Sequence, residues 1–162
     1  MPATSRLFEM LHFVHAMPSG IQAAYEDLYN GSPATDVVNL SKYGSVLWII
    51  QEAAGGTGTA TITVERCDDA VPTTQNAIRF DYWISTTSDV WSARTRAAVA
   101  GFGTSASANA MYAIEAHAVD LVGDNYIRLQ CDETESTAVD GTIFCILGNP
   151  RYAEDITATV LT

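Results

Sequence analysis

The sequence has few charged residues, and very few of them are basic. Charged residues make up 17% of the 162 residues, and 8 lysines and arginines stand against 19 acidic residues, for a formal net charge of −11. Proteins that bind nucleic acids neutralise phosphates with a concentrated basic surface. The nearest candidate in this chain is the pair Arg94 and Arg96. The charge balance therefore predicts a protein that does not bind nucleic acid.

Long apolar runs are also missing. No run approaches the ~18 apolar residues that a membrane-spanning helix needs, and the apolar stretch over residues 7–17 is interrupted by Glu9, His12 and His15. That stretch lacks the basic start and uninterrupted apolar core of a secretory signal. The sequence predicts neither a membrane span nor a secretory signal.

Cysteine is scarce and widely spaced. The three cysteines are Cys67, Cys131 and Cys145, and no Cys-x-x-Cys pair exists that would indicate a zinc site. Cys131 alternates with Ile127 and Leu129, and Cys145 lies within an apolar run. These surroundings predict buried, reduced thiols without a metal.

Recognisable catalytic motifs are absent. The chain has no Gly-x-Ser-x-Gly elbow, and its glycine-rich stretches at residues 55–58 and 101–103 are not followed by the lysine and helix of a phosphate loop. His12, His15 and His117 have no acidic residue at a spacing that completes a metal site, and the acidic stretches at 68–69 and 132–135 do not match a calcium loop. We therefore expect no enzyme activity, no cofactor and no metal.

What the chain does contain is strand-forming sequence, most clearly over residues 43–67. Residues 59–65 alternate polar and apolar side chains, which is typical of a half-buried strand. Residues 43–51 differ, because Val46, Trp48 and Ile50 fill one face while Leu47 and Ile49 fill the other. A strand that is apolar on both faces needs a cover on both faces. The second cover is either the N-terminal segment or another subunit, so we expect a small closed oligomer.

The rest of the chain indicates an all-β fold. Eight to ten short strands separated by turns, with no long helical pattern, predict a single-domain antiparallel β-sandwich of jelly-roll type over residues 36–162. Residues 77–85 read as one strand with Trp83 on its polar side, and residues 132–140 read as an acidic loop. Residues 1–35 are expected to form an N-terminal arm and lead-in, with 5–17 either extended or a short helix.

Candidate contact residues are the large apolar side chains of this arm and the tryptophans of the predicted strands. Aromatic anchors are enriched at protein interfaces, and an apolar arm needs a surface to dock on. We therefore expect partner contacts through six residues: Leu7, Phe8, Leu11, Phe13, Trp48 and Trp83.

The order of these pieces resembles a known family. The central strand from Tyr43, the glycine-rich loop, Thr61 to Glu65, the stretch from Ala77 to Tyr82, the stretch from Asp124 to Leu129, and Gly148-Asn149-Pro150 together look like small head proteins of tailed bacteriophages, of the capsid decoration or cement type. The resemblance covers about residues 36–162 and is a pattern of strands and turns, without a catalytic signature.

The resemblance implies a location and a partner. A cement protein is a β-sandwich, usually a homotrimer, that binds the major capsid protein on the outer surface of the virion and stabilises the shell without catalysis. It is made in the cytoplasm of the host bacterium. Two alternatives stay open: a phage neck or tail protein, or a carbohydrate-binding sandwich in which Trp83 and Trp91 form stacking platforms.

Overall fold

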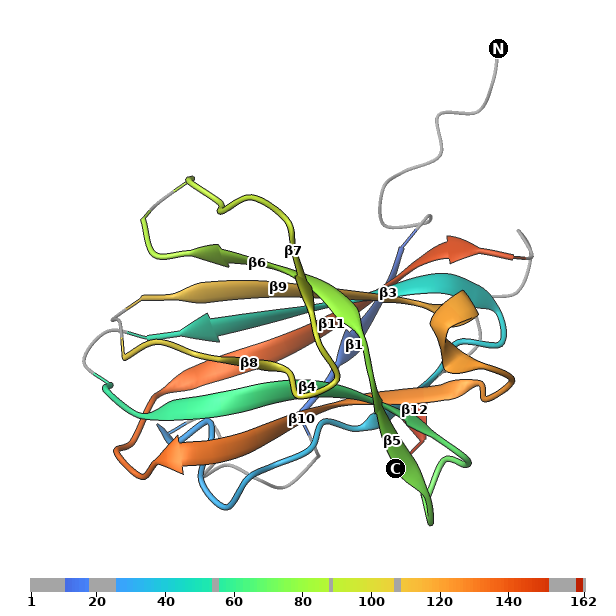
Figure 1. Ribbon diagram of the computed structural model, residues 1–162, viewed down its shortest axis with the longest axis horizontal. Helices are drawn as coiled ribbons and strands as arrows, with labels where there is room; N and C mark the ends of the chain where they lie inside the picture. The colour runs from blue at the N-terminus through green and yellow to red at the C-terminus, as the bar shows by residue number, and fades with distance from the viewer. Residues whose placement is uncertain are drawn as a thin grey trace.

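Two antiparallel β-sheets lie face to face in a computed structural model that describes residues 11–17, 26–53, 56–87, 89–106, 109–151 and 160–161 (Figure 1). Sheet A contains, in spatial order, β1 (His12–His15), β11 (Gly141–Pro150), β3 (Tyr43–Glu52), β9 (Met111–His117), β6 (Phe80–Ser85) and β7 (Thr95–Ala97). Sheet B contains β12 (Val160–Leu161), β2 (Val37–Asn39), β10 (Tyr126–Glu135), β4 (Thr59–Cys67) and β5 (Gln75–Ile78), and β8 (Phe102–Gly103) also pairs with β4. A short 3-10 helix, η1 (Ala118–Leu121), follows β9.

The strand pairing is that of a jelly roll. β1 pairs with β11, β2 with β10, β3 with β9, and β4 with β5, all antiparallel, so that the chain folds as one long hairpin wrapped across two sheets. In the described chain four strands are added to this plan: β6 and β7 extend sheet A beyond β9, β8 joins sheet B on β4, and β12 pairs with β2 at the edge of sheet B. The predicted all-β sandwich of jelly-roll type is confirmed.

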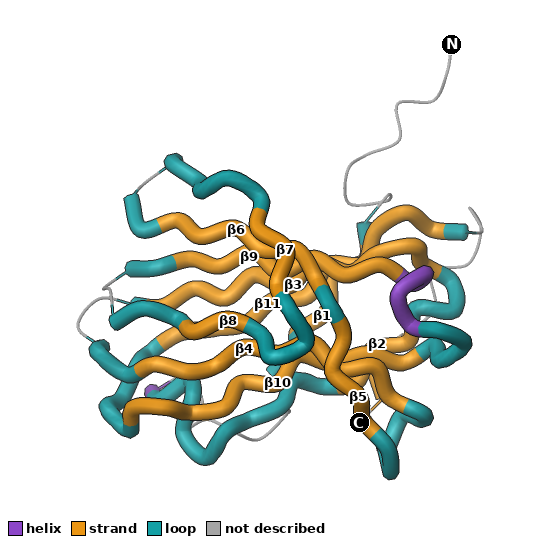
Figure 2. The backbone as a smooth tube through the Cα atoms, in the orientation of Figure 1, coloured by secondary structure: helices purple, strands orange, loops and turns teal. Residues whose placement is uncertain are grey.

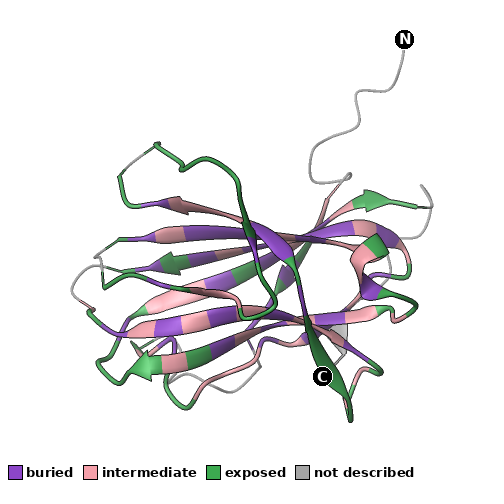
Figure 3. Ribbon diagram, viewed as in Figure 1, coloured by how far each residue is buried: buried purple, intermediate pink, exposed green. Residues whose placement is uncertain are grey.

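The core forms between the sheets from the alternating apolar residues of both. In β3, Val46, Trp48 and Ile50 are fully buried, and in β4 so are Ala60, Ile62 and Val64. Figure 3 shows the resulting bands of buried and less buried residues along neighbouring strands. The predicted apolar face of β4 is confirmed as buried, and in β3 the structure shows that the face with Trp48 is the inner one.

An aromatic cluster joins the sheets where β8 lies. Phe102, on β8, stacks on Tyr82 of sheet A with ring centroids 4.1 Å apart and planes 2° apart. It also meets Phe80 at 6.1 Å and Tyr112 at 5.7 Å in tilted arrangements. Aromatic pairs at these separations add to the stabilisation from burial, so Phe102 ties the added strands to the core.

The three cysteines are free and buried, as their neighbours in the sequence predict. Burial raises the pKa of the Cys67 thiol to about 11 and that of Cys131 to about 12. The thiolate is the nucleophile and metal ligand, and these raised pKa values keep the Cys67 and Cys131 thiols protonated at neutral pH.

The stretch 77–85 is two strands, and the prediction of one is wrong. Ile78 ends β5 and pairs with Val64 in sheet B, whereas Phe80 begins β6 and pairs with Ala97 in sheet A. The chain crosses between the sheets at Arg79. Ile78 and Phe80 both point into the core, so the alternation of the sequence continues unbroken across the corner.

The acidic stretch after Cys131 is also strand. β10 continues to Glu135, with Asp132 opposite Thr61 and Glu133 opposite Ala60. The prediction of a loop over 132–140 is therefore wrong for residues 132–135, and the loop begins after Glu135. Backbone hydrogen bonds extend this ladder beyond the apolar segment, and the carboxylates remain at the surface.

The described part of residues 1–35 belongs to the sandwich. His12–His15 form β1 at the edge of sheet A, so the helical alternative is wrong for these residues. Ala16 and Met17 are buried after it, and so are Leu28 and Tyr29. The sandwich thus includes residues that the sequence predicts as arm and lead-in, because β1 pairs with β11 and the residues around it are buried in the core.

Gly101 offers a test of the added strands. Its φ is +77°, and a Cβ there would clash with the backbone oxygen of Ile62. A side chain in this conformation costs about 1–2 kcal/mol before any clash. We expect Gly101→Ala to lower the melting temperature by roughly 5–10 °C, measured by circular dichroism.

Gly103 is the matched control. It lies two residues away, and an added Cβ would meet nothing within 4 Å. Gly103→Ala should leave the melting temperature within about 2 °C of wild type. Equal melting temperatures for the two variants would contradict the backbone conformation and the close packing described for Gly101.

Candidate functional site

The strands of sheet A lie side by side (Figure 2), and their register places side chains in rows across the outer face of the sheet. Strand register sets these rows, because residues directly opposite each other on neighbouring strands point to the same face. The first row is Phe13, Ile146, Leu47, Glu115, Asp81 and Arg96. The second row is His15, Phe144, Ile49, Ala113 and Trp83. The third row is Thr142, Gln51, Met111 and Ser85.

An apolar patch occupies much of the first two rows. We define it as Phe13, Leu47, Ile49, Trp83, Ala113, Phe144 and Ile146. Phe13 is 48% exposed and Phe144 45%, and Leu47, Ile49, Trp83 and Ile146 are half-buried. A sheet face that meets water usually alternates to polar residues. A contiguous apolar area on such a face is typical of an interaction surface.

Ion pairs border the patch on the side of β6, β7 and β9. Arg96 lies 3.4 Å from the carboxylate of Asp81 and 3.7 Å from that of Asp120. The imidazole of His117 lies 3.7 Å from the carboxylate of Glu115. An apolar centre with a polar border is the usual anatomy of a protein interface.

A small depression of about 280 Å³ lies beside the first row of the patch, where β3 begins and β11 ends. Leu11, Leu47 and Ile146 line it with apolar side chains. Ser45 and Asn149 also line it, and the Asn149 side-chain amide donates a hydrogen bond to Ser45 Oγ at 3.0 Å. The depression adds concave apolar surface to the patch.

A buried carboxyl lies at the opposite end of β3. Glu52 is 3% exposed. Tyr29 donates a hydrogen bond from its hydroxyl to Glu52 Oε1 at 2.6 Å, and the Tyr112 hydroxyl donates to Oε2 at 3.5 Å. Burial raises the pKa of Glu52 to about 7, and the two tyrosine hydrogen bonds partly oppose that rise.

The arrangement around Glu52 joins separate parts of the fold. Tyr29 belongs to the segment before β2, and Tyr112 belongs to β9 and accepts a hydrogen bond from the backbone N–H of Ser105 at 3.0 Å. Burial raises the pKa of Tyr29 far above its ordinary value, with a further contribution from Glu52, so its hydroxyl stays a donor. Within the described chain, Glu52 has two neutral partners and no second acid, which indicates a structural role.

Three of the predicted contact residues lie where a partner can reach them. Phe13 and Trp83 are in the patch, and Leu11 lines the small depression. Trp48 is a correction: its side chain is fully buried between the sheets and offers no contact surface. Leu7 and Phe8 lie outside the described residues.

Five patch residues are not among the predicted contacts: Leu47, Ile49, Ala113, Phe144 and Ile146. For Leu47 and Ile49 the sequence predicted only that their face needs a cover. Phe144 and Ile146 come from the apolar run 142–147, whose other face, Ile143, Cys145 and Leu147, is buried. Residues 142–147, like residues 43–51, are apolar on both faces of the strand. This pattern in the sequence could have indicated that the outer face of 142–147 also needs a cover.

Comparison of the chain with protein-family models, with curated proteins and with solved structures finds no match.

Among the described residues, no group of three or more histidine, cysteine, aspartate and glutamate side chains is placed to hold a metal ion. None of the helices in that part of the chain is long and apolar enough to cross a membrane.

Glu52 predicts a specific pH dependence. Its pKa is about 7 in the folded protein against an ordinary value of 4.5, so the folded state binds this proton more tightly. The resulting stabilisation is complete below pH 4.5 and is lost as the pH rises through 7, by up to about 3 kcal/mol. We expect Glu52→Gln to remove this part of the pH dependence, measured by urea unfolding between pH 4.5 and 8.

Glu135→Gln is the control. Glu135 is exposed on β10, so its removal should preserve the wild-type slope of unfolding free energy against pH. A Glu52→Gln protein with the wild-type slope would show that Glu52 titrates normally.

Proposed function

We propose that the protein is a virion structural protein, a decoration protein that binds the major capsid protein on the outside of a tailed-phage head. The observation that carries this proposal is the half-exposed apolar patch on the outer face of sheet A. The resemblance in strand and turn order to capsid decoration proteins suggests the major capsid protein as the partner. The jelly-roll fold is also used by viral capsid domains.

The patch has the features of a protein contact surface. Phe13, Phe144 and Trp83 are large side chains on three strands of one hydrogen-bonded sheet, β1, β11 and β6. Rigid aromatic anchors lose little conformational freedom on association and dominate measured interface energies. At the border, Arg96 pairs the carboxylates of Asp81 and Asp120 beside the contact.

The proposed function also depends on many copies of the protein binding to one shell. A partner that binds only the assembled shell stabilises that shell by mass action. Many copies on one lattice, or three copies in one trimer, add avidity without new kinds of contact. A moderate apolar patch on each copy is therefore sufficient, and we propose a homotrimer as the binding unit.

Oligomeric state separates this proposal from the main alternative. A carbohydrate-binding module needs no partner for sheet A and should be a monomer. A neck or tail protein would also be oligomeric, so binding to heads as opposed to isolated tails distinguishes these two structural roles.

Phe144→Asp tests the patch. The substitution places a carboxylate at a position that is 45% exposed in the single chain, so the fold should tolerate it, whereas a buried charge in a contact is costly. We expect at least about tenfold weaker self-association or head binding, measured by light scattering after gel filtration and by co-sedimentation with heads lacking the protein.

Val71→Asp is the matched control. Val71 is 77% exposed in the loop between β4 and β5, outside the patch, so this variant should associate and bind like wild type. A wild-type protein that is a monomer at micromolar concentration and does not bind heads would refute the proposal.

A further inference from the structure

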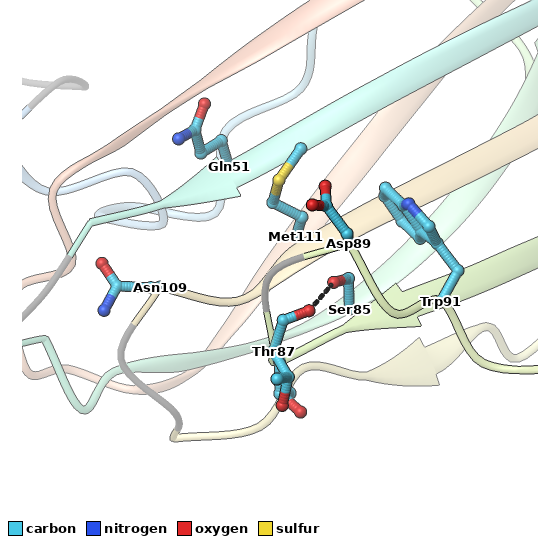
Figure 4. Close-up of a pocket in the computed structure, with 8 residues that line it drawn as sticks. Gln51, Ser85, Thr87, Asp89, Trp91, Asn109 and Met111 are labelled. Carbon is cyan, nitrogen blue, oxygen red and sulfur yellow. Dashed lines mark hydrogen bonds between the residues drawn. The ribbon is translucent and has the colours of Figure 1, made fainter.

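A polar depression lies at the other end of the same sheet face, and nothing above uses it. It has a volume of about 670 Å³, within the range of small-molecule sites. Its floor is the third row of sheet A, formed by Gln51, Met111 and Ser85. Its wall is the loop after β6, with Asp89 and Trp91. Figure 4 shows Gln51, Met111, Asp89 and Trp91 pointing to the same side of the sheet.

The loop that carries Trp91 is tied to the sheet. The Ser92 N–H donates to the backbone oxygen of Ile84 at 2.8 Å, and the Ile84 N–H donates to Ser92 Oγ at 3.0 Å. The Ser85 hydroxyl donates to the backbone oxygen of Thr87 at 3.0 Å (Figure 4). These bonds fix the backbone on both sides of Trp91, whose side chain is nevertheless 42% exposed. An exposed indole on an anchored loop is a preorganised binding surface.

The polar groups of the depression are available to a ligand. Gln51 and Asn109 contribute side-chain amides and Asp89 contributes a carboxylate. Within the described chain none of these three side chains makes a hydrogen bond or ion pair. Amides offer both donors and acceptors, and a carboxylate offers strong acceptors. The site therefore presents several unused hydrogen-bonding groups around one aromatic face.

These groups select a class of ligand. No lysine, arginine or histidine lines the depression, and the chain carries a net charge of −11, so phosphates and other anions are disfavoured. A pyranose ring has hydroxyl groups at its edge and an apolar C–H face. Amides and a carboxylate match the hydroxyls, and an indole matches the C–H face. We propose that this depression binds a neutral saccharide, with Trp91 as the stacking platform.

The saccharide site goes beyond the proposed capsid contact. It uses the third row and the loop after β6, whereas the apolar patch uses the first two rows. A protein on the outside of a virion that carries such a site would also contact glycans of a cell surface. The two proposals fail separately, because one is measured as association with protein and the other as binding of free sugar.

Saturation-transfer NMR with the intact protein tests this inference. The probes are glucose, galactose, mannose, N-acetylglucosamine and their common disaccharides, at concentrations up to about 20 mM, because single-site affinities for such small polar ligands are on the order of millimolar. We expect at least one probe to bind. Trp91→Ala should weaken it at least about tenfold, and Gln51→Ala should weaken it less, with both proteins folded by circular dichroism.

Val90→Ala is the control for the loop. Val90 is 62% exposed beside Trp91 and does not line the depression, so this variant should bind like wild type. The proposal is overturned if no probe binds, or if Trp91→Ala and Gln51→Ala both retain wild-type affinity. It is also overturned if tetramethylammonium, which an indole beside a carboxylate attracts as a cation, binds more tightly than every saccharide.

Discussion

The structure depends on β3, a strand that is apolar on both sides at the centre of sheet A. Trp48 and its inner neighbours are covered completely by sheet B. Leu47 and Ile49, on the outer side, lie between Phe144 and Ile146 of β11 and the residues of β9. The jelly-roll pairing that buries one side of β3 therefore gathers the other side into a patch. The same strand builds the core and the candidate interaction face.

Glu52 shows how the end of this strand is held. The alternation of β3 continues to Glu52 and points a carboxyl into the interior, where an unpaired charge would be costly. Two tyrosines satisfy it, and through Tyr29 they join the segment before β2 to sheet A. A polar group at a buried strand end thus fixes the position of a chain segment that has little regular structure of its own.

The sequence was sufficient for the fold class and for which face of β4 is buried, because period-two alternation of polar and apolar residues reports burial directly. It was not sufficient for the corner at Arg79, since Ile78 and Phe80 both face inward although they belong to different sheets. For the site, Phe13 and Trp83 were predicted as contact residues. Trp48 was misassigned, because residue type does not say which apolar face of a double-sided strand is the inner one.

The two ends of the outer face differ for a reason that lies in the connections. At one end, the first two rows lie within the strands, and most of their apolar side chains come from β3, from its neighbour β11 and from β1 at the sheet edge. At the other end, β3 and β6 terminate and β9 begins, so turn residues with polar side chains surround the last row. Strand interiors favour apolar and β-branched residues, and strand ends favour amides, hydroxyls and carboxylates. One face therefore combines an apolar surface suited to protein with a polar depression suited to a small hydroxylated ligand.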